Sequence, residues 1–455
     1  MNLRPRTLDS PSHIGLSFRI ILIALAAFLM TLPSALLSQW KNLPEKTAFK
    51  NGLTVITQTD GASTVTVLEL LIKGGKKAEP AGLEGISFLT TRLALEIPDQ
   101  SKVQELMEKS TRYMMTSRGD WSAIHIECLS ENLDSTLRIV IQILKDPLFS
   151  GIRIDRNKDS MNNARKMERD DNINLGHLAQ LGAFFRGAGY DGSVYGQEDS
   201  LKKIRGRDVQ SFFGVRFLPD NMILVAVSDL DSPKLIEILQ KHFGSLPPRT
   251  KVAASPSPVQ SDAAATQGGT RDLKDTLIEK ETKQALVSAG FLLPPVSARN
   301  YALATLLENL LGRGPGSRLW RLRSDEKLAY NVSAQMTIMK DAGMLETFLE
   351  TDSAKQGLAR AALTKKLGEF YEQGVAADEL VETKALLRAN YLRTNETKDR
   401  RAATLGSYEA LGLGYDFFLK YPQELNAVTL EEINAFVREY LSSEKAHFVT
   451  VGPLK

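Results

Sequence analysis

The sequence predicts an α+β protein built from two tandem, homologous α/β sandwich domains. Three observations favour this fold class: a length of 455 residues, an internal repeat, and alternating helix and strand patterns within each copy of the repeat. A chain of this length exceeds what one ordinary hydrophobic core accommodates, so two or more domains are expected.

The internal repeat is clearest in a helix-then-strand segment that occurs twice. Residues 208–230 align without gaps with residues 432–454, and in both the apolar residues change from helical spacing to strand alternation. Two shorter pairs support the same alignment: Leu181 and Gly182 with Leu405 and Gly406, and GAGYD at 187–191 with GLGYD at 412–416. Agreement in three separate stretches indicates a tandem duplication.

Within the first copy, strand and helix patterns alternate. Residues 49–57 hold an Asn-Gly turn between strand-like runs, which predicts a hairpin, and strand patterns recur at 65–72 and 123–129. Apolar residues at helical spacing predict helices over 82–95, 101–110, 133–144 and 158–172. This order favours helices packed on one sheet, and the second copy is expected to share it.

A low-complexity segment separates the two copies. Residues 248–270 are rich in Pro, Ser, Ala and Gly and lack apolar periodicity, which is typical of an exposed linker. We therefore expect a first domain over 41–247, a linker over 248–273 and a second domain over 274–455.

The N-terminal residues predict export. Arg4, Arg6 and Arg19 precede an apolar run over residues 20–32, and small residues follow it. Residues 1–38 are expected to form a signal peptide or, if it is not cleaved, an N-terminal anchor that would be the only membrane contact. The bacterial periplasm is the expected destination, with a eukaryotic secretory or organellar compartment as the alternative.

The composition excludes some classes of protein. Lys and Arg number 57 against 54 Asp and Glu, so no nucleic-acid partner is expected. Cys128 is the only cysteine, so no internal disulfide forms, and its strand-like surroundings predict a buried, unreactive thiol.

The start of the first copy resembles a family of zinc peptidases. The strand at 68–75 ends in Gly-Gly and is followed by an acidic stretch that opens a helix. This order resembles the zinc metallopeptidase family of pitrilysin, insulinase and mitochondrial processing peptidase, in which the helix carries the motif G-[LTA]-A-H-x-x-E-H. The resemblance implies that the two domains face each other as a clamshell around a chamber.

The catalytic motif of that family is degenerate in this chain. With Gly82 set on the motif's glycine, Gly85 and Leu89 fall at its two histidines and Phe88 at its general-base glutamate, while Ala164 falls at the third metal ligand. None of these side chains binds a metal or accepts a proton. The five histidines also form no H-E-x-x-H or H-x-x-E-H motif, so no metal and no cofactor are expected in this chain.

The second copy retains another motif of the same family. Residues 317–330 read SRLWRLRSDEKLAY, and Arg323 and Tyr330 have the spacing of the family's Arg–Tyr signature. The resemblance implies that Arg323 binds a substrate carbonyl and that Tyr330 stabilises the oxyanion at a zinc site. The glycine turn before them, with Gly312, Gly314 and Gly316, is a candidate substrate-binding loop.

Some members of this family divide these two features between two chains. The resemblance therefore implies a non-catalytic, substrate-binding subunit of a heterodimeric periplasmic peptidase, whose homologous partner carries the zinc and whose substrates are peptides or unfolded segments. The alternative is an inert scaffold or binding protein of the same fold. A hydrolase with an unrelated site is a third, weaker hypothesis.

Overall fold

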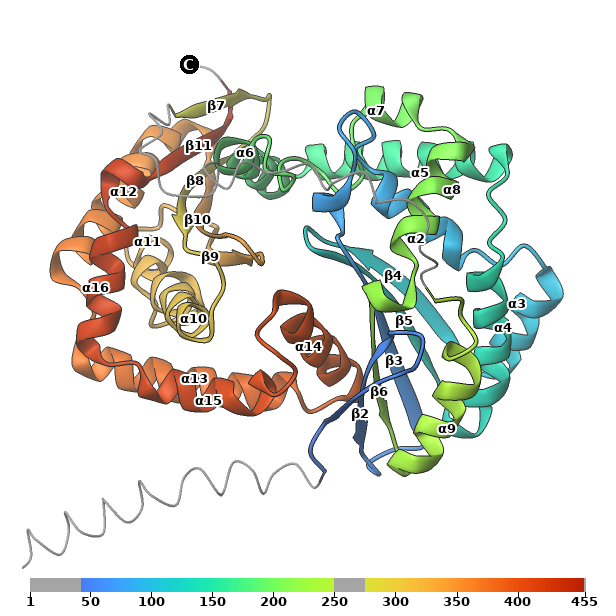
Figure 1. Cartoon of the computed structure of the whole chain (residues 1–455). Coiled ribbons are helices and arrows are strands. Elements are labelled where there is room, and N and C mark those ends of the chain that lie inside the picture. The colour runs from blue at the N-terminus through green and yellow to red at the C-terminus, as the bar shows by residue number, and fades with distance from the viewer. Residues whose placement is uncertain (1–41, 249–274, 454–455) are drawn as a thin grey trace, which may run out of the picture. The chain divides into compact units, whose positions relative to one another are not determined.

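The computed structural model describes residues 42–248 and 275–453 (Figure 1). The predicted signal segment and nearly all of the predicted linker lie outside the described residues. None of the helices within the described ranges has the length and apolar character that crossing a membrane requires. Both halves described below lie within one compact unit, Pro44–Lys455.

The first half contains a six-stranded mixed sheet. Its order is β1-β2-β6-β3-β5-β4, with β2 and β6 parallel and the other neighbours antiparallel. The Asn-Gly turn joins β1 to β2, which confirms the predicted hairpin. The strands are β1 (Glu45–Ala48), β2 (Thr54–Thr59), β3 (Val65–Lys73), β4 (Arg112–Ser117), β5 (Trp121–Leu129) and β6 (Met222–Ser228).

The second half contains a five-stranded sheet with the same central arrangement. Its order is β7-β11-β8-β10-β9, and here β7 and β11 form the parallel pair. The predicted repeat ends in β6 and β11, and each of these lies between one parallel and one antiparallel neighbour. The strands are β7 (Thr276–Glu279), β8 (Gln284–Leu293), β9 (Asn331–Ile338), β10 (Gly343–Asp352) and β11 (His447–Gly452).

Helices cover both sheets, which confirms the predicted α+β class. In the first half they are α2 (Ile86–Leu95), α3 (Gln100–Glu108), α4 (Leu133–Lys145), α5 (Gly151–Asp170), α6 (Asn172–Phe185), α7 (Glu198–Lys203), α8 (Gly206–Arg216) and α9 (Ser232–Phe243). In the second half they are α10 (Ala298–Gly312), α11 (Arg321–Ser324), α12 (Gln356–Gln373), α13 (Ala377–Thr394), α14 (Lys398–Leu411), α15 (Phe417–Ala427) and α16 (Leu430–Tyr440).

The main core of the first half lies between its sheet and the helices α4 and α9. Leu68 and Leu70 of β3 face Leu137 of α4 and Leu239 of α9, all fully buried. Cys128 of β5 belongs to this core, as predicted, and burial raises the pKa of its thiol to about 11. The thiol is therefore protonated and unreactive at neutral pH.

Two helices that the repeat pairs with each other are exchanged between the halves. Helix α6 packs on β8 and β11 of the second sheet, whereas α14 packs on β3 and β6 of the first sheet (Figure 1). Glycines permit both contacts, since a Cβ on Gly176 would lie 2.3 Å from a methyl group of Leu286, and a Cβ on Gly406 would lie 2.5 Å from a methyl group of Leu71. Each half therefore contributes one helix that packs on the sheet of the other half.

Two predicted helices have other limits in the structure. The helix predicted over 82–95 begins at Ile86, because Gly82 and Gly85 have φ angles of +81° and +98°, which end any helical path. The helix predicted over 158–172 begins at Gly151 and ends at Asp170. Its first turn alternates Ile152 and Ile154 with charged residues, a pattern that lacks helical apolar spacing.

Candidate functional site

The degenerate motif lies at the first turn of α2, where Glu79 caps the helix. The Glu79 carboxylate accepts hydrogen bonds from the backbone N–H groups of Gly85 and Ser87, each at 3.0 Å. These are donors that a helix start leaves without partners in its own ladder. An acid at this end of a helix is also favoured by the helix dipole.

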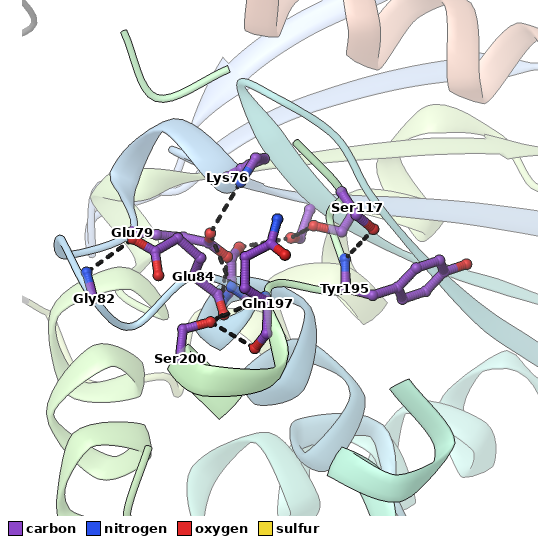
Figure 2. Close-up of polar contacts among 12 residues, drawn as sticks. Lys76, Glu79, Gly82, Glu84, Ser117, Tyr195, Gln197 and Ser200 are labelled. Atoms are coloured by element: carbon purple, nitrogen blue, oxygen red, sulfur yellow. Dashed lines mark hydrogen bonds and ion pairs between the residues drawn. The ribbon is translucent and has the colours of Figure 1, made fainter. Parts of the chain in front are cut away.

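Glu79 is buried together with a lysine. Its exposed fraction is 8%, and the Lys76 Nζ lies 3.7 Å from its Oε2 (Figure 2). Burial raises the pKa of Glu79 to about 7, although Lys76 and the two N–H donors act in the opposite direction. Glu79 and Lys76 therefore form a buried polar pair at the place where the family carries its zinc motif.

A second loop closes over the same turn. A Cβ on Gly196 would lie 2.1 Å from the carbonyl oxygen of Glu84, so the two backbones are in direct contact. The Ser200 hydroxyl donates to the Glu84 carbonyl at 2.8 Å and accepts the Gln197 N–H at 3.0 Å (Figure 2). The turn before α2 is thus held from both sides.

The four predicted motif positions all have packing roles. Gly85 is the N-cap of α2, and a Cβ there would lie 3.0 Å from the backbone of Tyr195 and Gly196. Phe88 stacks edge-to-face on the Tyr195 ring at 4.9 Å, and Leu89 is fully buried. Ala164 lies half-buried on α5, which packs against α2.

These residues do not fit a zinc ion. No motif position offers a lone pair, and both oxygens of Glu79 are already occupied by the helix N-terminus. Across residues 42–248 and 275–453, no group of three or more His, Cys, Asp or Glu side chains is arranged to hold a metal. This site differs from the family's zinc site in its side chains and also in its backbone, because Gly85 has a positive φ and stands before the helix.

The histidines within the described ranges lie in four separate places. His125 contacts Glu69 and His177 contacts Glu346, each at 2.9 Å. His242 contacts Asp134 at 2.8 Å. His447 contacts Gln180 at 2.8 Å, between the second sheet and the exchanged helix α6. Each ring therefore links two elements of the fold.

The retained pair, Arg323 and Tyr330, lies on the surface of the second half. Arg323 is exposed on α11, and its guanidinium carbon lies 4.9 Å from the Trp320 ring centroid. In the part of the chain that the structure describes, Arg323 forms no ion pair with Asp325 or Glu326. These two acids instead contact Ser324 and Lys366. The guanidinium therefore stacks on an aromatic ring and keeps its donors towards solvent.

Tyr330 stands immediately before the edge strand β9. Its side chain is 59% exposed, an unusual value for a tyrosine next to a sheet. Its backbone N–H donates to the Glu350 carbonyl at 2.9 Å, which fixes the start of β9 against β10. The ring is thus displayed to solvent from a rigid backbone position.

The three glycines of the predicted turn differ in their surroundings. A Cβ on Gly312 would lie 2.1 Å from the Ala334 backbone nitrogen, so this glycine allows α10 to pack on β9. Gly314 and Gly316 have φ angles of +88° and +102° and have no atom within 4 Å of a Cβ. Only these two belong to an open turn, which Ser317 closes by donating its hydroxyl to the Gly314 carbonyl at 2.7 Å.

No motif in the sequence predicted the roles of Glu79 and Lys76. Their signal was present as the sequence KKAEP, an acid shortly before a helix start. An acid in this position favours an N-terminal cap of a helix, a role that is distinct from metal binding.

Two curated relatives are similar to most of the chain. The one from Helicobacter pylori, named Non-peptidase homolog YmxG, is 24% identical over 395 residues, which cover 85% of this chain and 89% of the relative. The one from Bacillus subtilis, named Uncharacterized zinc protease YmxG, is 21% identical over 403 residues, which cover 87% of this chain and 95% of the relative.

Solved structures share the fold at low identity. A peptidase M16 inactive domain from Pseudomonas fluorescens has a TM-score of 0.79 and 18% identity, over 91% of this chain and 98% of that chain. The periplasmic protease PqqL from Escherichia coli has a TM-score of 0.71 and 16% identity, over 90% of this chain and 47% of that chain. This chain thus corresponds to about half of PqqL.

The family assignment follows from the site and the comparisons together. Residues 203–387 match the family described as Peptidase M16 inactive domain. The positions of the family's metal ligands hold Gly85, Leu89 and Ala164, and the position of its general base holds Phe88. Residues 203–387 belong to this family, and the chain as a whole is similar to a non-catalytic M16 protein without the zinc motif.

Proposed function

We propose that this chain is the substrate-binding subunit of a heterodimeric zinc peptidase. In that complex, a homologous partner supplies the zinc motif, and this chain supplies Arg323 and Tyr330. The observation that carries the proposal is the contrast between the two motifs. The metal positions are closed by packing and by Glu79, whereas Arg323 and Tyr330 are exposed and available to a partner.

The chemistry of the pair suits a peptide bond under attack. A guanidinium offers several fixed N–H donors, and a phenol offers one O–H donor. Donors aimed at the developing oxyanion lower the barrier by a few kcal/mol, which corresponds to roughly a 10²–10³-fold change in rate. Peptides and unfolded segments would reach such a site as an extended strand added to the partner's sheet edge.

The length comparison supports a paired arrangement. This fold spans 90% of this chain but only 47% of PqqL, a longer single chain. A unit of this fold therefore occurs as part of a larger protease, and a heterodimer would bring two such units together without a covalent link.

The alternative function is an inert scaffold of the same fold. The stacking of Arg323 on Trp320 favours it, because that contact gives Arg323 a role within its own chain. The scaffold hypothesis predicts that Arg323 and Tyr330 affect stability but not turnover.

The test is co-expression of this chain with a homologous chain that bears the H-x-x-E-H motif. Peptide cleavage is expected from the pair and from neither chain alone. Arg323→Ala and Tyr330→Phe are each expected to lower kcat of the pair by roughly 10²–10³-fold while the complex stays assembled on size exclusion. Arg321→Ala, at another exposed arginine of α11, is the matched control. Unchanged turnover in both variants would support the scaffold.

Export to the periplasm belongs to the same proposal. Arg4, Arg6, Arg19 and the apolar run at 20–32 support it. Cell fractionation with N-terminal sequencing of the purified chain tests it. Recovery of an intact N-terminus in the cytoplasmic fraction would contradict it, whereas an intact N-terminus in the membrane fraction would indicate the anchored form.

A further inference from the structure

A cavity of about 330 Å³ lies in the second half, between helices α10, α13, α14 and α15. Four tyrosines line it: Tyr301, Tyr391, Tyr408 and Tyr421. This volume is at the small end of the range for cavities that bind ligands, about 300–1,000 Å³. It suits a ligand of the size of one or two amino acids.

The tyrosine rings form a rigid wall. Tyr301 meets Tyr408 and Tyr421 edge-to-face, at centroid distances of 5.5 and 5.4 Å, and Tyr391 lies 4.9 Å from Tyr421. The Tyr391 hydroxyl donates to the Phe418 carbonyl at 2.7 Å, which holds that ring in place. Rings fixed in this way present faces and edges to an aromatic occupant at little entropic cost.

The phenols are neutral at any physiological pH. Burial raises the pKa of Tyr391 and of Tyr408 well above the ordinary value of 10. The wall therefore supplies aromatic surface and hydroxyl groups but no negative charge.

A buried amide contacts the tyrosine wall. Asn395 lines the cavity with an exposed fraction of 1%, and its Nδ2 donates to the Tyr391 carbonyl at 2.9 Å. That bond fixes the orientation of the amide, and its Oδ1 is buried without a donor among the described residues. That oxygen has almost no exposed surface, so an occupant of the cavity does not reach it.

The charge of the cavity favours an anion. Arg400 is the only charged residue among the described residues that line it, and Thr404 and Ser407 add hydroxyl groups nearby on α14. The neighbouring acid, Asp399, accepts a hydrogen bond from the Arg400 backbone N–H and does not line the cavity. An arginine with hydroxyl groups is well suited to a carboxylate.

We propose that this cavity binds an aromatic residue with a free α-carboxylate. Its ring lies against the tyrosines, and its carboxylate pairs with Arg400. A free aromatic amino acid and the C-terminal residue of a peptide share this chemistry. The inference is independent of the proposed peptidase pairing, because every group in it belongs to this chain.

Binding there has a structural consequence for α14. Arg400 and Thr404 face the cavity, whereas Lys398 and Arg401 on the same helix reach the first half. Lys398 donates to the carbonyls of Ser63 and Val65, each at 2.7 Å, and Arg401 forms an ion pair with Asp60. An occupied cavity therefore stabilises the helix that crosses between the halves.

The test uses the full chain alone and three probes: L-phenylalanine, the dipeptide Ala-Phe and its C-terminal amide. Isothermal titration is expected to give saturable binding of Ala-Phe or phenylalanine at about 1 mM or tighter, with a rise in melting temperature. The amide is expected to bind about tenfold more weakly or not at all, because it lacks the carboxylate. Tighter binding of Ala-Phe than of phenylalanine indicates a peptide C-terminus, and the reverse indicates a free amino acid.

Two variants and a control locate the binding. Arg400→Gln is expected to weaken Ala-Phe binding about tenfold, and Arg438→Gln, an exposed arginine of α16 away from the cavity, is expected to leave it unchanged. Ala403→Phe fills the cavity and is expected to abolish binding. Equal binding of acid and amide, unchanged binding in Arg400→Gln, or no binding of either carboxylate probe would each overturn the proposal, even if Ala403→Phe failed to fold.

Discussion

The carboxylate of Glu79 caps the helix that follows Gly85, with its Oε2 3.0 Å from the Gly85 nitrogen. Position 85 is where the family's first histidine ligand would stand. A turn glycine tied to an internal acid occupies that place, and its φ of +98° starts the helix one residue later. The chain thus lacks the metal ligands and instead has a capped glycine turn at this position.

Substitution of Gly85 tests how firmly this turn is closed. Gly85→Ala is expected to cost about 2–4 kcal/mol, because a Cβ combines left-handed strain with contacts at 3.0 Å to Tyr195 and Gly196. Gly82→Ala is the matched control, since Gly82 has a similar φ but no neighbour within 4 Å, and about 1 kcal/mol is expected there. Urea unfolding measures both, and equal costs would show that the turn is open.

The pH dependence of stability tests Glu79. Its folded-state pKa of about 7 lies above its ordinary value of 4.5, so ionisation opposes folding. The stabilising contribution of the protonated carboxyl is complete below pH 4.5 and is lost as the pH rises through 7, a loss of about 3 kcal/mol.

Glu79→Gln removes this titration and isolates its effect from that of other acids. The free energy of unfolding of the variant, measured relative to the unmodified protein, is expected to rise by about 2.5 kcal/mol between pH 5 and pH 8. Denaturant unfolding at several pH values measures the difference. Parallel pH profiles would contradict the buried state of Glu79.

The three glycines of the predicted turn are expected to differ in their effect on stability. Gly312→Ala is expected to cost about 3 kcal/mol or more, because its Cβ would lie 2.1 Å from the Ala334 backbone nitrogen. Gly314→Ala and Gly316→Ala are expected to cost about 1 kcal/mol each, from their positive φ alone. Thermal unfolding compares the three, and similar losses at all three positions would refute a packing role special to Gly312.

The sequence predicted the structure best where a short local pattern determines it. The Asn-Gly turn predicted the β1–β2 hairpin, and the repeated helix-strand segment predicted the equivalent places of β6 and β11. The absence of metal ligands at Gly85, Phe88 and Leu89 could also be read directly.

The remainder depended on contacts between distant residues. Pairing Leu181 and Gly182 with Leu405 and Gly406 identified equivalent helices, but a repeat does not say which sheet each helix covers. The cap by Glu79 depends on the φ of Gly85, which a helical apolar pattern does not reveal. The tyrosine cavity depends on helices α10, α13, α14 and α15 meeting in space.

The exchanged helix α14 is held to the first half by an ion pair between the buried Arg401 and the partly buried Asp60. Arg401 is 4% exposed and Asp60 keeps the Ala62 N–H and a nearby Lys398, so Arg401→Met is expected to cost about 2 kcal/mol. Burial raises the pKa of Asp60, but the Ala62 N–H and Arg401 outweigh it and hold that pKa below 3.8. The stabilisation is therefore present above about pH 4 and is lost as the pH falls further.

A double-mutant cycle with Asp60→Asn isolates the interaction. Each single variant is expected to be destabilised at pH 7, and the double variant is expected to lose less than the sum, with a coupling of about 2 kcal/mol. The coupling is expected to shrink at pH 3, where Asp60 is increasingly protonated, as measured by urea unfolding at both pH values. A coupling near zero at pH 7 would mean that Gly406 and the apolar contacts of α14, rather than this ion pair, hold the exchanged helix on the first sheet.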